Sequence, residues 1–439
     1  MTSDKVKVFT KAFGFFIPYL GRTALQRVAA VGHRWSWQNT PDAKNVVVLG
    51  GSFAGIELVK RLSETLPTGY KAVWIEKNSH LNFSFNFPRY SVLEGHEHAA
   101  FIPYDGIAKN APAGIFTRIQ DKAIGVTENN QIQLASGDNI DFEYLAIATG
   151  SSQPLPVQVT STERNKGCHE LQGVQKTIKA SQKIAIIGGG AVGVEIASDI
   201  KDFYPDKEVT LVHSRDQLLN NFGKRFGDYT LNALRDELQI RVLLNERPAI
   251  PGNFARGAAL KFSDGHEEQF DLVIGCTGQR PNSSVLAAAY PNTLAKNSRI
   301  LVRSTLQVFD STDAKKDLPM FAFGDVADHP GPRMARAGLM QSEVVLDNIL
   351  AKINGQEANR TYTPNWFVEG AIKLTLGKKH EVTYAMDNDG SDIMIPDRNG
   401  KLDLEIESAW KRYGVDFKEV SKGKTEAEPE VQAPAAVQV

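Results

Sequence analysis

Two short runs of apolar residues in this chain each lead into a glycine-rich turn and then into a helical pattern. The first run covers residues 45–49 and meets the turn 50–55, and the second covers 183–187 and meets the turn 188–193. Continuous β-branched runs of this kind are typical of parallel strands that are buried on both faces of a sheet. The apolar spacing after each turn is that of a helix with one face packed on such a sheet. The pattern therefore predicts two separate strand–turn–helix units.

Each unit continues with a second predicted strand, and the residue at its end helps to decide what the turn binds. In the first unit this residue is Glu76, and in the second it is His213, with Arg215 two residues further on. A glycine turn at a helix N-terminus holds the pyrophosphate of a dinucleotide, and an acid at the end of the next strand accepts ribose hydroxyls. The first unit is expected to bind a dinucleotide. Its second glycine is replaced by Ser52, whose side chain leaves less room for the phosphate to approach the backbone. In the second unit all three glycines are present, and the missing acid predicts tolerance of NADPH, with Arg215 either bound to the 2′-phosphate or simply solvated.

Three later segments close these units and set the order of the domains. Strands that end in a glycine turn are predicted at 144–150 and 272–282, and a strand that runs into a Gly-Asp motif at 320–328. The predicted fold is α/β, with two Rossmann-like dinucleotide-binding domains, the second inserted in the first, and a small C-terminal α+β domain. We expect an N-terminal segment 1–43, a first dinucleotide domain in two parts (44–170 and 291–355), a second dinucleotide domain 171–290, a C-terminal domain 356–420 and a disordered tail 421–439.

The composition narrows the functional classes. The chain has 439 residues, and its 50 Lys and Arg balance 51 Asp and Glu, so no overall field favours nucleic acid. The only two cysteines, Cys168 and Cys276, are far apart in sequence, which excludes a CxxC redox pair, a cysteine zinc site and a disulfide framework. His80, His96 and His98 lie close together in sequence, but no second ligand cluster accompanies them, so no metal is expected.

The first forty residues are basic and amphipathic. Apolar side chains recur there mostly at three- and four-residue steps, at Val6, Phe9, Phe13, Phe16, Ile17, Leu20, Ala24, Val28 and Val31. This spacing predicts a helix with one apolar face and a kink at Pro18. Three interpretations stay open: a helix that lies on a membrane surface through residues 5–31, an organelle targeting segment, and an extra helix packed on the domain. Because no run of about 20 apolar residues occurs, no membrane-spanning helix is expected.

The glycine turns, the closing segments and the Gly-Asp motif together resemble the flavoproteins with two dinucleotide-binding domains. These include pyridine nucleotide disulfide reductases, type II NADH dehydrogenases and apoptosis-inducing-factor-like proteins. Residues 87–95, 188–200, 208–214 and 324–328 are most similar to the membrane-associated ferroptosis suppressor NAD(P)H:quinone oxidoreductases, and the likeness covers about residues 45–385. The resemblance implies that the first turn holds FAD, that the second holds NADH or NADPH, and that Asp325 contacts FAD.

Motifs and resemblance together give a set of expected site residues. Glu195 follows the last glycine of the second turn by two residues. It is the predicted catalytic residue, with its carboxylate at the nicotinamide. The alternative is that this acid only interacts with the helix dipole and has no chemical role. The resemblance implies that Arg89 contacts FAD and that Ala123 contacts its adenine. The expected cofactor-binding residues are Gly50, Gly51, Ser52, Phe53, Ala54, Gly55, Glu76, Lys77, Arg89, Ala123, Thr149, Gly150, Gly188, Gly190, Ala191, Val192, Gly193, His213, Arg215, Gly278, Gly324, Asp325, Met334 and Ala335.

The missing cysteines decide the class of electron acceptor. Disulfide reductases of this superfamily hold a cysteine pair beside the flavin, in a stretch that corresponds to residues 78–97, and this chain has no cysteine there. The expected activity is FAD-dependent electron transfer from NAD(P)H to a small non-disulfide acceptor, above all a quinone, at or near a membrane. A ferredoxin-type or tailoring reductase, a non-enzymatic effector of the apoptosis-inducing-factor type, and a homodimer stay open. The expected place is intracellular, on the cytoplasmic face of a membrane, on a lipid droplet or on a mitochondrion.

Overall fold

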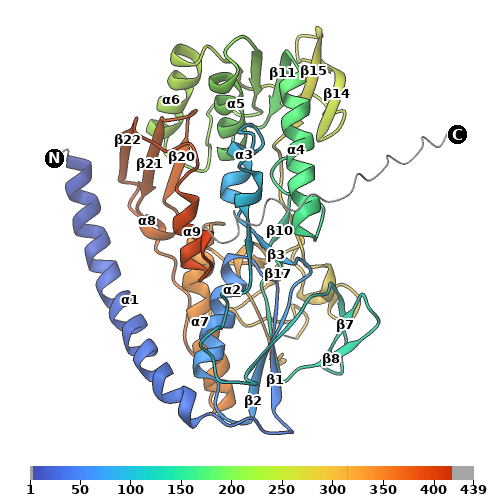
Figure 1. Cartoon of the computed structure of the whole chain (residues 1–439), viewed down its shortest axis with the longest axis vertical. Coiled ribbons are helices and arrows are strands. Elements are labelled where there is room, and N and C mark those ends of the chain that lie inside the picture. The colour runs from blue at the N-terminus through green and yellow to red at the C-terminus, as the bar shows by residue number, and fades with distance from the viewer. Residues whose placement is uncertain (1–2, 314, 418–439) are drawn as a thin grey trace, which may run out of the picture.

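The computed structural model describes residues 3–313 and 315–417. The side chains of Val6, Phe9, Phe13 and Phe16 lie outside the described part, and so does the expected tail 421–439. Figure 1 shows the first dinucleotide domain at the lower end of the molecule and the second at the upper end.

The first dinucleotide domain is built on a five-stranded parallel sheet with the order β18-β9-β1-β2-β5. Its strands are β1 (Lys44–Leu49), β2 (Tyr70–Ile75), β5 (Phe116–Ile119), β9 (Tyr144–Ile147) and β18 (Met320–Ala322). Because β18 follows the whole second domain in sequence and yet pairs with β9, the second domain is inserted in the first. This confirms the predicted fold class, while the residue limits given for the domains stay predictions.

The two faces of this sheet are covered by different layers, because alternate residues of each strand point to opposite sides. Val46 and Val48 pack with the helices α2 (Phe53–Thr65) and α7 (Ala335–Ile353) in one core. Val47 and Leu49 pack on the other side against a three-stranded antiparallel sheet of β6 (Ala123–Val126), β7 (Gln131–Leu134) and β8 (Asn139–Asp141).

The second dinucleotide domain repeats this plan with the strand order β13-β12-β11-β15-β14. The strands are β11 (Lys183–Ile187), β12 (Glu208–Val212), β13 (Arg241–Leu243), β14 (Phe254–Lys261) and β15 (Glu267–Gly275), and only β14 runs antiparallel to its neighbour. Its helices are α4 (Arg164–Ala180), α5 (Ala191–Phe203) and α6 (Lys224–Asn232). Two short strands, β10 (Ser151–Ser152) and β16 (Arg280–Pro281), pair where the chain crosses between the domains.

The C-terminal domain joins the two dinucleotide domains. It consists of the antiparallel strands β20 (Ile372–Thr375), β21 (Glu381–Met386) and β22 (Asp392–Asp397) with the short helices α8 (Trp366–Glu369) and α9 (Ile406–Arg412). Leu374 and Tyr384 belong to the core of the second domain, whereas Ile406 and Trp410 belong to the core of the first. The helix α3 (Phe87–Tyr90) lies at the same junction and packs on α5.

The N-terminal helix α1 (Ser3–Ser36) is continuous through Pro18 and runs along one side of the molecule (Figure 1). One side of it is tied to the first domain: Arg22 pairs with Asp347 at 2.6 Å, and His33 Nε2 lies 2.7 Å from the carbonyl oxygen of Leu66. The described apolar side chains of the predicted face all point into solvent, namely Ile17, Leu20, Ala24, Val28 and Val31. Among the described residues, no helix combines the length and apolar character needed to cross a membrane.

Candidate functional site

The first glycine turn is closely packed at Gly50 and Gly55, where a larger residue has no room. Gly50 has a φ of +104°, which favours glycine, and a Cβ there would overlap the carbonyl oxygen of Ala148. A Cβ on Gly55 would overlap the carbonyl oxygen of Gly50. The indole N–H of Trp74 donates to the same oxygen at 3.1 Å. The turn at the end of β1 is therefore held by contacts within the protein.

Glu76 closes this turn from the end of β2. Its carboxylate accepts hydrogen bonds from the backbone N–H of Gly51 and, at 2.8 Å, from that of Asn78. Burial raises the pKa of Glu76, and the two N–H donors oppose that rise. The hydroxyl of Tyr104 donates to the carbonyl oxygen of Gly51 at 2.5 Å. This places the acid beside the turn, where it is expected to meet ribose hydroxyls.

Ser52 begins α2 without strain. Its φ of −102° and ψ of −165° lie in the extended region, as do the −80° and −179° of Gly190, which holds the same position in the second turn. No glycine-specific conformation is required at either place. The Ser52 side chain is exposed and caps no helical N–H. Its effect on the approach of phosphate stays a prediction.

Asp325 of the Gly-Asp motif lies next to β10, one of the two short strands that pair where the chain crosses between the domains. The Ser151 hydroxyl donates to its carboxylate at 3.1 Å. Burial raises the pKa of Asp325, while this hydrogen bond and the cations Arg333 and Arg299 lower it. Arg299 also donates to the Asp325 carbonyl oxygen at 3.3 Å. The two arginines were not predicted as site residues, and they supply positive charge where a pyrophosphate is expected.

The N-terminal ends of α2 and α7 meet next to this motif. A Cβ on Gly338, in the first turns of α7, would lie 2.8 Å from the Ala54 Cβ, and one on Gly324 would lie 3.7 Å from it. Met334 is the N-cap residue of α7 and Ala335 its first residue. Two helix N-termini, each with free N–H groups and partial positive charge, therefore converge on one place. The predicted residues Phe53, Ala54, Asp325, Met334 and Ala335 come together here.

A buried polar network that the sequence analysis missed supports the Gly-Asp motif. The Gly324 N–H donates to the side-chain oxygen of Gln341 at 2.7 Å, and the Gln341 side-chain nitrogen lies 3.2 Å from the His329 ring. Burial lowers the pKa of His329 to about 3, so this ring is neutral. Tyr362 packs edge-on against His329 and donates to the buried carboxylate of Glu369. Its members lie in three separate segments, so no motif spacing reveals the network.

Three further residues lie around the expected adenine end of the first site. Lys77 is exposed directly after Glu76, and Ala123 begins β6 and is half-buried. Arg118, which was not predicted, follows on β5 and places its guanidinium 4.8 Å from the centre of the Tyr104 ring. Its buried Nε has no hydrogen-bond partner among the described residues. A planar cation in this position suits stacking on an aromatic base.

The crossing between the domains is fixed by reciprocal hydrogen bonds. The Thr149 hydroxyl donates to the Asn282 carbonyl oxygen at 2.8 Å, and the Asn282 amide donates back to the Thr149 carbonyl oxygen at 2.9 Å. The Asn282 N–H also donates to the Gly150 carbonyl oxygen at 2.9 Å. Gly278 is exposed with a φ of +76°, and a Cβ there would meet nothing within 4 Å. Thr149 and Gly150 are thus brought to the same crossing as Asp325.

The second glycine turn has the same close packing as the first. A Cβ on Gly188, whose φ is +124°, would lie 2.6 Å from the Cys276 carbonyl oxygen, and one on Gly193 would overlap the Gly188 carbonyl oxygen. By contrast, a Cβ on Gly190 would meet nothing within 4 Å. The turn is therefore closed toward the protein and open toward the side where a dinucleotide would lie. Gly190, Ala191, Val192 and Gly193 line the start of α5 there.

His213 takes the place in the second turn that Glu76 takes in the first. The Gly189 N–H donates to His213 Nδ1 at 3.0 Å, and the His213 side chain is buried. Burial lowers the pKa of His213, so the ring is neutral. Its Nε2 is buried and without a hydrogen-bond partner among the described residues. Arg215 is exposed two residues later.

Glu195 lies where α5 meets the C-terminal domain. Its carboxylate accepts hydrogen bonds from the backbone N–H of Thr375 at 3.2 Å and from the Thr375 hydroxyl at 3.4 Å. Burial raises the pKa of Glu195 to about 8, the nearby Asp199 adds to the rise, and Thr375 and Arg89 oppose it. A carboxyl group that changes its charge near neutral pH is suited to donate or accept a proton in a hydrogen bond with a ligand.

Arg89 lies at this junction. Its guanidinium pairs with Asp199 of α5 at 2.8 Å and donates to the Gly377 carbonyl oxygen at 2.7 Å. The side chain is 1% exposed. The expected contact of Arg89 with FAD stays a prediction.

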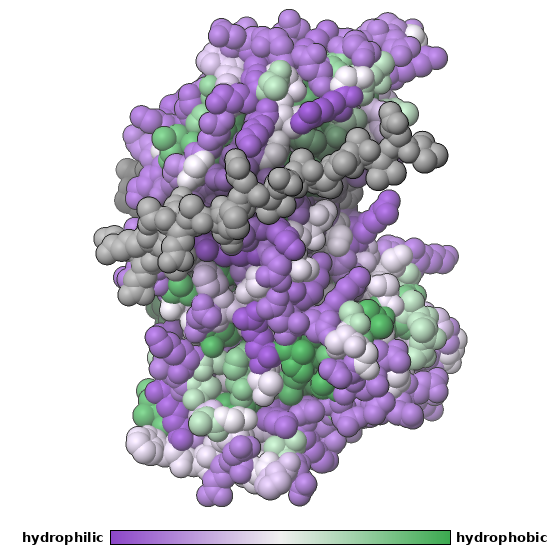
Figure 2. All heavy atoms as spheres, turned by 45° about the vertical axis from the view of Figure 1, so that its right-hand side comes forward, coloured by the Kyte–Doolittle hydropathy of each residue, from purple (hydrophilic) through white to green (hydrophobic). Residues whose placement is uncertain are grey.

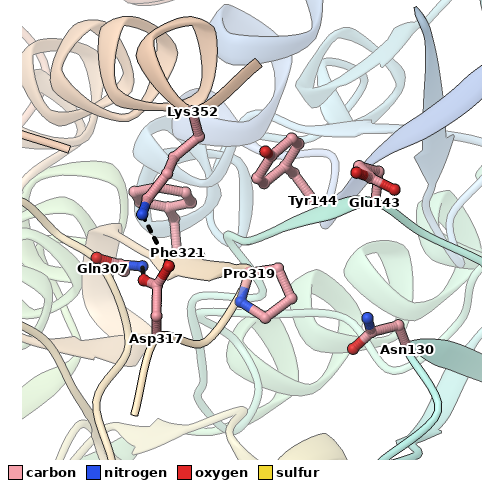
Figure 3. A pocket seen from close by; sticks show the side chains of 8 residues that line it. All are labelled: Asn130, Glu143, Tyr144, Gln307, Asp317, Pro319, Phe321 and Lys352. Carbon is pink, nitrogen blue, oxygen red and sulfur yellow. Dashed lines mark hydrogen bonds and ion pairs between the residues drawn. The ribbon is translucent and has the colours of Figure 1, made fainter. Parts of the chain in front are cut away.

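A pocket in the first domain lies apart from both turns. Figure 3 shows Lys352 pointing toward Asp317, and Nζ of Lys352 lies 2.8 Å from Oδ2 of Asp317. Tyr144, also in its wall, begins β9. The pocket thus opens at the amino ends of the strands, whereas the glycine turns follow their carboxyl ends. In parallel sheets, ligands bind at the carboxyl ends, so we assign no cofactor to this pocket.

The protein has two glycine turns that each fit a dinucleotide. In each turn the backbone N–H of the second residue, Gly51 or Gly189, donates to a polar side chain at the end of the next strand. The family model described as pyridine nucleotide-disulphide oxidoreductase matches residues 44–342. The chain belongs to this family. The resemblance to flavoproteins with two dinucleotide-binding domains is confirmed.

Relatives and solved structures agree with this assignment. The chain is 32% identical over 396 residues to Fe-regulated protein 8 of Mycosarcoma maydis, a match that covers 85% of this chain and 95% of the relative. It is 29% identical over 385 residues to ferroptosis suppressor protein 1 of Mus musculus, with 84% and 95% covered. The sulfide:quinone oxidoreductase of Aquifex aeolicus shares the fold, with a TM-score of 0.63 at 20% identity over 84% of this chain and 90% of that one.

This family membership confirms the predicted enzyme class and cofactors. The protein is an oxidoreductase that uses FAD together with NAD(P)H. Within residues 3–313 and 315–417, no group of three or more His, Cys, Asp or Glu side chains is arranged to hold a metal ion. The roles of the single site residues stay predictions.

Proposed function

We propose that this flavoprotein passes electrons from NAD(P)H to a quinone at a membrane surface. The observation that carries the proposal is the placement of its only two cysteines. Cys168 packs against the core of the first domain and Cys276 against that of the second, and burial raises the pKa of Cys276 to about 12. A thiol with such a raised pKa is almost entirely protonated at neutral pH and is therefore a poor nucleophile. No dithiol is present to relay electrons, so the acceptor must meet the flavin directly.

The side chains of the site orient the two nucleotides and keep water from the junction between them. When bound, FAD supplies the chemistry, since it accepts a hydride from NAD(P)H and passes electrons to the acceptor. The tight turn at Gly188 and Gly193 fixes the pyrophosphate of NAD(P)H at the start of α5. Glu195, two residues further along that helix, then faces the nicotinamide end, with its carboxyl held in place by Thr375. This is the role we propose for Glu195.

A quinone suits such a site better than the other acceptors. Quinones accept two electrons and two protons without a protein thiol, and the protonatable carboxyl group of Glu195 can assist the proton step. A small redox protein would need a charged docking face, and the balance of 50 cationic against 51 anionic residues offers no overall field for one. The similarity to ferroptosis suppressor protein 1 over 84% of this chain supports the same acceptor class.

The helix α1 supports the membrane part of the proposal. Its outward side carries six large apolar side chains that are each at least 51% exposed, namely Ile17, Leu20, Leu25, Val28, Val31 and Trp35. The cations Arg27 and Arg34 are exposed on the same helix. An apolar stripe with flanking cations and an exposed tryptophan is typical of a helix that lies in a lipid interface. The face shown in Figure 2, by comparison, is mainly hydrophilic, with hydrophobic groups in smaller patches.

Steady-state kinetics with alternative acceptors test the proposed function. The purified holoprotein is mixed with NADH or NADPH and, separately, with a water-soluble short-chain quinone, oxidised glutathione or lipoamide. We expect the quinone to be reduced at least about 100-fold faster than either disulfide, because a barrier difference of a few kcal/mol already gives this ratio. A disulfide reduced as fast as the quinone would contradict the proposal.

A further inference from the structure

Arg89 joins three parts of the fold through its guanidinium group. It comes from α3 of the first domain, and its Nε donates to the Asp199 carboxylate of α5 in the second domain at 2.8 Å. The same group donates to the carbonyl oxygens of Gly377 at 2.7 Å, Leu402 at 3.3 Å and Lys378 at 3.4 Å, all in the C-terminal domain. Arg89 and Asp199 are 1% and 0% exposed, so this ion pair is hardly screened by solvent.

Asp199 connects this ion pair with Glu195. One carboxylate oxygen of Asp199 accepts from Arg89, whereas the other is buried without a hydrogen-bond partner among the described residues. Glu195 precedes Asp199 by four residues on α5, so both side chains lie on the same face of the helix. The charge of Asp199 therefore acts on Glu195 across one helical turn in a poorly solvated place.

Two further charged groups among the described residues act on this ion pair. Asp202 lies on α5 and Lys378 in the loop after β20, and both act on Asp199. Burial and the charge of Asp199 raise the pKa of Glu195, while Arg89 acts in the opposite direction. Thr375, the hydrogen-bond donor to Glu195, carries no charge.

We propose that Arg89 is a positioning residue that acts through Asp199 to set the charge state of Glu195 while the nicotinamide coenzyme binds. The inference rests on the proposed function, in which Glu195 faces the nicotinamide. With Arg89 in place, Asp199 stays ionised and neutralised by its partner. Without Arg89, two carboxyl groups one turn apart share a proton and titrate as a coupled pair. The same guanidinium also fixes the C-terminal domain, and with it Thr375, against α5.

Substitutions that change charge but keep size separate this role from a purely structural tie. Asp199→Asn leaves the Arg89 cation unbalanced near Glu195 and should lower the pKa of Glu195. Arg89→Gln leaves the Asp199 charge unbalanced and should raise it. The double variant Arg89→Gln/Asp199→Asn removes both charges and should return the pKa of Glu195 toward that of the parent protein. A residue that only held domains together would not move this pKa in opposite directions in the two single variants.

The experiment is an infrared pH titration of the holoprotein, in which the protonated carboxyl band of Glu195 is assigned by its loss in Glu195→Gln. We expect a downward shift of about one unit or more in Asp199→Asn and an upward shift in Arg89→Gln, since an unpaired charge within a few ångströms has effects of this size. Shifts of the same sign in both single variants, or no shift in either, would overturn the inference. If Arg89→Gln does not fold, Asp199→Asn decides the question: a downward shift of the Glu195 pKa supports the inference, and no shift or an upward shift overturns it.

Kinetics then separate this inference from the proposed function. The pH profile of flavin reduction by NADH is recorded for the same variants. If the titration and the pH profile shift together, both are supported. If the infrared titration shifts as expected and the pH profile does not follow, the role of Arg89 is supported and the proposed role of Glu195 at the nicotinamide fails.

Discussion

The backbone N–H of Gly189 donates a 3.0 Å hydrogen bond to Nδ1 of His213. In the first domain the corresponding N–H, that of Gly51, donates to the carboxylate of Glu76. Two turns of the same plan thus differ in the side chain that is expected to face the ribose: one has a carboxyl group and the other a neutral imidazole. Because a carboxylate repels a 2′-phosphate and an imidazole does not, this difference bears on the choice between NADH and NADPH.

The first prediction concerns this choice. His213→Glu should raise the KM for NADPH relative to that for NADH by about tenfold, or about 1.4 kcal/mol, because a carboxylate then faces the 2′-phosphate. Steady-state kinetics with both coenzymes measure the ratio, and binding of 2′,5′-ADP against 5′-AMP measures it without turnover. Arg215→Ala is the matched test of the exposed cation, and it should weaken only the 2′-phosphorylated ligands. An unchanged ratio in His213→Glu would show that this residue does not face the ribose.

Two glycines of the second turn give a matched pair of variants. In Gly193→Ala the new Cβ overlaps the Gly188 carbonyl oxygen, so the turn must move, and we expect a loss of about 1–3 kcal/mol in the free energy of unfolding with loss of NAD(P)H binding. In Gly190→Ala the new Cβ meets no protein atom, so stability should be unchanged while coenzyme binding weakens. Thermal unfolding and coenzyme titration check both. Full coenzyme affinity in Gly190→Ala would place the pyrophosphate elsewhere.

The raised pKa of Glu195 predicts a pH dependence of stability. Its value of about 8 lies above the ordinary 4.5, so between these values the folded protein binds one proton more than the unfolded chain. The free energy of unfolding contributed by this group is therefore highest at low pH and falls as pH rises toward 8, by up to about 1.4 kcal/mol per unit.

Urea unfolding at several pH values checks this dependence. Glu195→Gln should lack the fall, whereas Glu208→Gln, a control at an exposed glutamate of β12, should keep it. Parallel pH curves for the parent protein and Glu195→Gln would contradict the raised pKa.

The outward face of α1 predicts binding to lipid. Sedimentation with vesicles that contain anionic lipid should carry down the parent protein, and Leu25→Ser/Val28→Ser should reduce the bound fraction several-fold, because two exposed apolar side chains no longer enter the interface. Ile124→Ser removes an exposed apolar side chain from β6 and serves as the control. Trp35, which is 89% exposed, should shift its fluorescence to the blue on binding. Equal binding of the double variant and the control would contradict a membrane role of this face.

The sequence predicted those parts of the site that local patterns determine. Gly50 to Gly55 and Gly188 to Gly193 stand in a strand–turn–helix context whose geometry follows from a few consecutive residues, and the structure has both turns. The network of Gln341, His329 and Tyr362 was missed because its members meet only through the tertiary fold. Arg299, Arg333 and Arg118 were missed for the same reason.

Arg89 marks the other limit of the sequence analysis. The resemblance implied an FAD contact from a short matching segment, and that contact stays a prediction. The buried partners of this residue, Asp199 and the Gly377 carbonyl group, lie 110 and 288 positions away in the chain. A charge buried at a junction of three domains leaves no local signal in sequence.

The most direct test of the account is anaerobic stopped-flow of the purified holoprotein. The visible absorbance of the flavin is followed as NADH or NADPH is added, and then as a short-chain quinone is added. We expect rapid bleaching by the nicotinamide coenzyme and rapid recovery with the quinone. A bound flavin that NAD(P)H does not bleach, or a reduced flavin that the quinone does not reoxidise, would contradict it.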